Sequence, residues 1–105
     1  MSNRLFQGIV HQMKDAIDRT IGVIDETSTI ISCSELGHIG EITEVDFAEL
    51  NGINDTMVKN GYTYRPFGTP QRHEYAVFVE GDDPQASKYA ALLGGVAERH
   101  QTVLR

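Results

Sequence analysis

The most reactive side chain in the sequence is its single cysteine, Cys33. Nucleophilic catalysis would require Cys33 together with a histidine, such as His38 or His73, and an acid such as Asp25. These residue types are present, but no nucleophile elbow or other local signature of a hydrolase surrounds them. A lone cysteine at the end of a predicted strand is typical of a small buried hydrophobic side chain. The sequence therefore predicts a protein that is not an enzyme, with a small hydrolase as a minor alternative.

The histidines do not follow a metal-binding pattern. Cys33 and His38 supply two potential ligands, whereas a structural zinc ion takes four. Residues 37–40 lack the glycine spacing and the lysine of a phosphate-binding loop. The sequence predicts neither a metal ion nor another cofactor. The four scattered histidines are His11, His38, His73 and His100.

A second set of polar side chains favours binding. Hydroxyl, imidazole and guanidinium groups follow the first predicted hairpin and flank the later strands. If the irregular segment 34–51 folds over the sheet, these groups line a pocket for a small anion, with Arg65 as a bidentate carboxylate clamp. The alternative interpretation is that the arginines are exposed and pair with surplus acids. The candidate ligand-binding residues are Ser32, Ser34, His38, Arg65, Arg72 and His73.

A helix and a hairpin precede this irregular segment. Residues 3–20 carry apolar side chains at helical spacing, which predicts an amphipathic helix. Two β-branched runs, 21–25 and 29–32, are separated by three polar residues and predict a hairpin. Segment 34–51 is polar and interrupted by glycine, with a weak helix start at Thr43.

Further strands follow the irregular segment. Asn60-Gly61 predicts a tight hairpin turn because both residues tolerate positive φ. Residues 68–71 form a second turn signal. The strands expected around these turns are 56–59, 62–67 and 74–80.

A long final helix begins at Asp83-Pro84, where Asp caps free N–H groups and Pro suits the first turn. Its apolar residues between 86 and 103 recur at alternating spacings of three and four, as in helices that pack on a neighbour. The two terminal helices carry more apolar surface than one small sheet needs, which predicts a homodimer with these helices at its interface. Gly94 and Gly95 indicate the close approach of another helix.

The order of elements predicts an α+β fold. There is no βαβ alternation, so an antiparallel sheet of about five strands with long N- and C-terminal helices fits best. PAS, GAF and roadblock-type domains share this architecture. We expect the 105 residues to form one domain, because this is the usual size of a single domain.

Composition excludes several classes of partner. Fifteen acidic residues outnumber nine basic ones, and the net charge of −6 disfavours direct binding of nucleic acid. The apolar stretch 75–79 is far shorter than the ~20 residues of a membrane span, and the sequence contains no longer one. The N-terminus lacks the pattern of a secretory signal. We therefore expect a cytoplasmic protein that does not bind membranes.

Four motifs occur in a characteristic order. They are Ile24-Asp25-Glu26, residues 30–34, His38-Ile39-Gly40-Glu41, and residues 77–84. In this order the chain resembles the N-terminal sensing domain of bacterial sugar-diacid and purine-catabolism type transcriptional regulators. Family members usually carry glycine where this chain has Ser28, and arginine where it has His38.

The resemblance implies a sensing and dimerising domain of a transcriptional regulator. Such a domain would bind a small, anionic metabolite and relay the signal to a helix-turn-helix that lies far downstream. A ligand that favours one packing of the terminal helices would bias the output domain. The rival interpretation is a roadblock or longin-type interaction module without a small ligand. A polar cavity containing Arg65 or His38 would favour the sensor, and a dry apolar interior beneath residues 33–55 would favour the interaction module.

Overall fold

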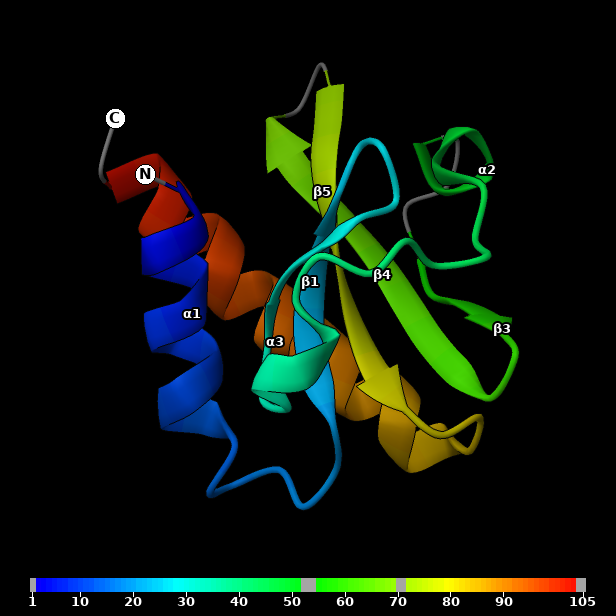
Figure 1. Cartoon of the computed structure of the whole chain (residues 1–105), viewed down its shortest axis with the longest axis horizontal. Helices are drawn as coiled ribbons and strands as arrows, with labels where there is room; N and C mark the ends of the chain where they lie inside the picture. The colour runs from blue at the N-terminus through cyan, green and yellow to red at the C-terminus, as the bar shows by residue number, and fades with distance from the viewer. Residues whose placement is uncertain (1, 52–54, 70–71, 104–105) are drawn as a thin grey trace.

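The computed structural model describes residues 2–51, 55–69 and 72–103. Its centre is an antiparallel sheet with the strand order β2-β1-β5-β4-β3 (Figure 1). Sequential strands pair as hairpins except β2 and β3, which lie at opposite edges of the sheet, and β5 lies between β1 and β4. The strands are β1 (Ile21–Asp25), β2 (Ile30–Cys33), β3 (Met57–Lys59), β4 (Tyr62–Thr69) and β5 (Arg72–Glu80).

Helices cover the two faces of the sheet unequally. The longer helices, α1 (Ser2–Met13) and α3 (Pro84–Val103), pack on one face. The short helix α2 (Phe47–Asn51) packs on the other face, and the 3-10 turn η1 (Leu36–His38) follows β2 (Figure 1). The predicted α+β class with one five-stranded antiparallel sheet is therefore confirmed.

The central strand β5 serves two hydrophobic cores at once. Val77 and Val79 face α1 and α3, whereas Ala76 and Phe78 face α2 and the segment before it. Successive side chains of a strand point to opposite faces, so a strand covered on both faces reads as a continuous apolar run. This is why residues 75–79 form an unbroken apolar run.

Helix α1 ends at Met13, seven residues before the end that the sequence predicts. The chain then turns, with the N–H of Ile17 donating to the Met13 carbonyl (2.9 Å). Ile17 still enters the core and is 1% exposed. Ile17 fits the helical periodicity of the preceding residues, but a turn and not a helix brings its side chain into the core.

Helix α3 uses its apolar stripe within its own domain. Ala86, Ala90, Leu93 and Ala97 are buried against the sheet and α1. The partner that approaches Gly94 is the sheet, since a Cβ there would contact Arg65 and Val77, and not another helix. On the described part of α3, the apolar stripe is therefore buried within the domain and is not available to a partner.

The start of α3 is fixed by an ion pair from the loop after α1. Arg19 Nη1 and Nη2 donate to the two carboxylate oxygens of Asp83, at 2.5 and 2.8 Å. The guanidinium holds the pKa of Asp83 well below its ordinary value. Asp83 Oδ1 also accepts from the N–H of Ala86 (3.3 Å), which confirms the predicted helix cap.

Candidate functional site

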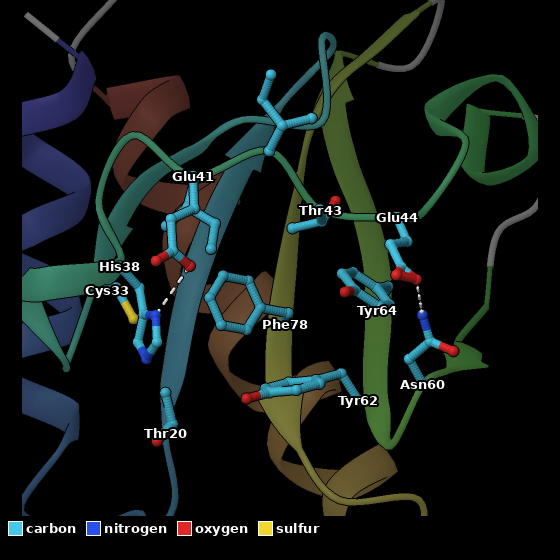
Figure 2. Close-up of a pocket in the computed structure, with 12 residues that line it drawn as sticks. Thr20, Cys33, His38, Glu41, Thr43, Glu44, Asn60, Tyr62, Tyr64 and Phe78 are labelled. Carbon is cyan, nitrogen blue, oxygen red and sulfur yellow. Dashed lines mark hydrogen bonds and ion pairs between the residues drawn. The ribbon is translucent and has the colours of Figure 1, made fainter.

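A pocket of about 220 Å³ lies on the face of the sheet that α1 and α3 leave open. It is bounded by β4 and β5 below and by the segment 38–44 above (Figure 2). Both polar and apolar side chains line it, as is typical of small-molecule sites. The lining residues are Thr20, Ile30, Cys33, His38, Glu41, Ile42, Thr43, Glu44, Asn60, Tyr62, Tyr64 and Phe78.

Three aromatic rings form the floor of the pocket. Tyr64 lies opposite Phe78 in the β4–β5 register. Tyr62 precedes Tyr64 by two residues and lies on the same face of β4. The ring centroids of Tyr62 and Phe78 are 5.9 Å apart in an edge-to-face arrangement, and those of Tyr64 and Phe78 are 6.2 Å apart. Such contacts hold the rings in place.

Backbone hydrogen bonds to the first hairpin fix the segment above the rings. The N–H of Ile30 donates to the Glu41 carbonyl (2.8 Å), and the N–H of Gly40 donates to the Ile30 carbonyl (2.8 Å). The N–H of Thr43 donates to the Ser28 carbonyl (2.8 Å). The segment therefore extends the sheet edge at β2 and holds its side chains over the pocket.

Two polar pairs form the rim of the pocket. His38 Nδ1 lies 2.9 Å from Glu41 Oε1, and Asn60 Nδ2 donates to Glu44 Oε2 at 2.9 Å. Figure 2 shows these pairs on opposite sides of Phe78. The pocket thus has carboxylates on both sides of an aromatic floor.

The tyrosines of the floor are held in their neutral form. Burial raises the pKa of Tyr62, and the charges of Glu80 and Glu41 raise it further. Burial also raises the pKa of Tyr64, with a smaller contribution from Glu44. The electrostatic potential that these carboxylates produce at the phenol groups is negative.

Of the predicted site residues whose side chains the structure describes, only His38 lines this pocket. Ser34 Oγ is instead tied to the sheet, where it accepts from the N–H of Ile21 (3.0 Å). Ser32 pairs with Val23 and is completely buried. Its Oγ has no hydrogen-bond partner among the described residues.

Arg65 lies on the opposite face of the sheet from His38. It pairs with Val77 in the register, next to α3, and its guanidinium is 3.5 Å from Asp55. The pocket that it lines, of about 210 Å³, is bounded by α3, including Gly94 and Glu98. The structure therefore does not bring Arg65 and His38 into one site.

Arg72 and His73 begin β5, and their side chains lie outside the described residues. Their backbone pairs with the last residues of β4, Thr69 and Gly68. Arg72 is six residues before Phe78, which corresponds to about 20 Å along a strand. The backbone thus places both residues at the end of β5 remote from the aromatic floor.

Several pocket residues were missed by the sequence analysis. Tyr62 and Tyr64 alternate along a predicted strand, so their common face was readable. Glu41, Glu44 and Asn60 come from turns and irregular backbone. Only the tertiary structure shows that these segments meet over the rings.

Cys33 is completely buried beside the pocket. Burial raises the pKa of its thiol, more than the hydrogen bond from the Glu35 N–H lowers it. Little thiolate is therefore present near neutral pH, and the thiolate is the reactive form. This agrees with a structural cysteine.

We expect iodoacetamide at pH 7.5 to alkylate native Cys33 at least about tenfold more slowly than the same thiol in urea-unfolded protein. Mass spectrometry gives both rates, and the unfolded chain is a matched control because it carries the same single cysteine. The native rate should increase as the pH rises towards the thiol pKa. Equal or faster alkylation of the folded protein would revive a catalytic or redox role for Cys33.

Within the described ranges, no group of three or more His, Cys, Asp and Glu side chains is placed to hold a metal ion. Nor is any helix in this part of the chain both long and apolar enough to cross a membrane.

Comparisons with known proteins give no relative. No family model matches the chain, and searches of curated proteins and of solved structures find no match. The class of protein is therefore defined by its own fold and site, as a small α+β domain with a pocket on one face of its sheet.

Proposed function

We propose that this chain is the ligand-sensing and dimerisation domain of a bacterial transcriptional regulator. The observation that carries the proposal is the pocket of about 220 Å³ between the sheet and the segment containing His38. The pocket has a mainly apolar floor and a polar rim that includes His38, and an open pocket at this position favours a sensor over an interaction module with a solid interior. The resemblance of the motifs around Asp25, Ser32 and His38 to metabolite-responsive regulators supports the same function.

The route for a signal runs through the sheet. Phe78 lies on the pocket floor, while its neighbours Val77 and Val79 pack beneath α1 and α3. A ligand that favours one position of β5 would therefore also favour one packing of the terminal helices. These helices would pass the bias to a downstream helix-turn-helix.

A thermal-shift screen of organic acids, purine-catabolism intermediates, phosphorylated sugars and amines tests the proposal. A ligand at about one hundred times its dissociation constant stabilises the fold by about 2.7 kcal/mol. Tyr62→Ala should abolish this shift because it removes one wall of the pocket. Arg65→Ala is the matched control on the opposite face and should retain it. A screen without hits, or a hit that stabilises both variants equally, would contradict the proposed site.

A homodimer belongs to the same proposal, and exposed apolar side chains outside the terminal helices offer an interface for it. The described part of the α3 stripe is buried within the domain, whereas Leu36, Ile39 and Ile42 are exposed near the pocket. These side chains also favour the alternative function, a roadblock or longin-type interaction module. We expect sedimentation equilibrium at micromolar concentration to show a dimer. A monomer of 11.7 kDa throughout would contradict this assembly.

A further inference from the structure

The charged groups at the pocket are predominantly acidic. Glu41 and Glu44 line it, and Glu80 pairs with Tyr62 in the register and therefore shares the face. The rim pairs neutralise these charges only in part. Glu41 lies beside His38, but the partner of Glu44 is the uncharged amide of Asn60.

The basic side chains near the pocket face of the sheet either form ion pairs outside the pocket or lie at the edge of the sheet. Among the described residues that line the pocket, none is lysine or arginine. Arg19, next to the lining residue Thr20, forms its two-pronged ion pair with Asp83. Lys59 pairs with Tyr62 and so shares the face, on the edge strand β3, but it is not a lining residue. An anionic ligand would therefore meet carboxylates without a compensating cation inside the pocket.

The aromatic floor complements this charge distribution. The faces of Tyr62, Tyr64 and Phe78 carry negative electrostatic potential and attract cations within about 6 Å. Quaternary and primary ammonium groups are bound in this way when rings and carboxylates surround them. Rings and acids therefore favour the same sign of ligand charge.

We infer that the pocket binds a small organic cation, with Glu44 as charge partner and the rings of Tyr62, Tyr64 and Phe78 as its aromatic walls. This rests on the proposed function and names the ligand class of the same pocket. A volume of about 220 Å³ corresponds to roughly seven water molecules in the liquid. The ligand is thus comparable in size with choline, and the anionic metabolite expected from the sequence does not fit the charges of the pocket.

Choline and its neutral carbon isostere 3,3-dimethylbutan-1-ol form a matched pair of probes. Isothermal titration calorimetry at low ionic strength should detect choline and not the isostere, because the two differ in charge and hardly in shape. Glu44→Gln should weaken choline binding on the order of tenfold, since it removes one unit charge beside the cation. Tyr62→Leu should weaken it about two- to thirtyfold by removing an aromatic face. Adding sodium chloride should weaken binding further.

Glu98→Gln removes the same charge from α3 on the opposite face and should leave choline affinity unchanged within twofold. Equal binding of choline and the isostere, unaltered affinity in Glu44→Gln, or no heat with choline would overturn the cationic ligand. Succinate provides the opposing arm of the experiment. If succinate binds and Tyr62→Leu abolishes its binding, the sensor function stands and only the ligand class is wrong. If no probe or screened compound binds, the sensor function fails as well.

Discussion

Gly22→Ala is expected to destabilise the domain by at least about 3 kcal/mol and to leave much of the protein unfolded at 37 °C. A Cβ at position 22 would lie 2.5 Å from Phe78 Cζ and closer still to the backbone carbonyl of Ser32. The ring can rotate or shift, but the carbonyl belongs to the neighbouring strand β2. Urea unfolding followed by circular dichroism measures the effect.

Gly95→Ala is the matched control for this substitution. Position 95 lies inside α3, and a Cβ there would meet nothing within 4 Å. Alanine should therefore stabilise the helix by about 1 kcal/mol. The double variant Gly22→Ala/Phe78→Leu should recover only part of the loss because the carbonyl of Ser32 remains in place. Wild-type stability of Gly22→Ala would contradict the described contact between β1, β2 and β5.

Phe78→Ala is the second substitution with a large expected effect. Phe78 is 3% exposed and joins the pocket floor to the second hydrophobic core. Truncating a buried phenylalanine costs about 3–5 kcal/mol, and we expect a loss in this range. Chemical denaturation gives the loss of stability, and titration with a pocket ligand should show no binding.

Leu93→Ala is a control that separates the loss of stability from the loss of ligand binding. Leu93 belongs to α3 and is completely buried against the opposite face of the sheet, and its truncation costs about 2–5 kcal/mol. The two variants should therefore lose similar stability, while only Phe78→Ala loses ligand binding. If Leu93→Ala abolishes binding at a temperature where it is folded, the pocket is not the ligand site.

Local signals in the sequence predicted the sheet well. Asn60 and Gly61 both have positive φ, at 53° and 82°, as a tight hairpin requires. Ser28, which stands where the resembling family carries glycine, also has positive φ, at 66°. Its hydroxyl donates to the Val45 carbonyl at 2.7 Å, a contact between distant segments that helps to hold the turn. Turn chemistry depends on adjacent residues and can therefore be read from the sequence.

The periodicity of apolar residues in the helices did not show which part of the molecule each helix packs against. A stripe of apolar residues on α3 has the same spacing whether it packs on a second helix or on the sheet of its own domain. Ala86 and Leu93 pack on the sheet. In α1 the periodicity also extended beyond the helix end at Met13.

The candidate site was predicted only in part, because the sequence analysis did not assign each strand residue to a face of the sheet. Arg65 stands between Tyr64 and Pro66 on β4, so it points away from the face that Tyr64 occupies. Assigning a residue to a face requires the strand register, and an error of one residue moves the side chain to the other side. His38 was identified because its segment had to cross one of the two faces.

Chemical-shift mapping tests the central claim most directly. A ¹H–¹⁵N spectrum of the domain would be recorded while choline, or the strongest hit of the thermal-shift screen, is added to saturation. We predict the largest shifts at residues around the pocket, including Cys33, Glu44, Tyr62 and Phe78, and smaller shifts at Arg65 and Gly94 on the opposite face. Largest shifts at Arg65 and Gly94, with an unchanged pocket, would contradict the account.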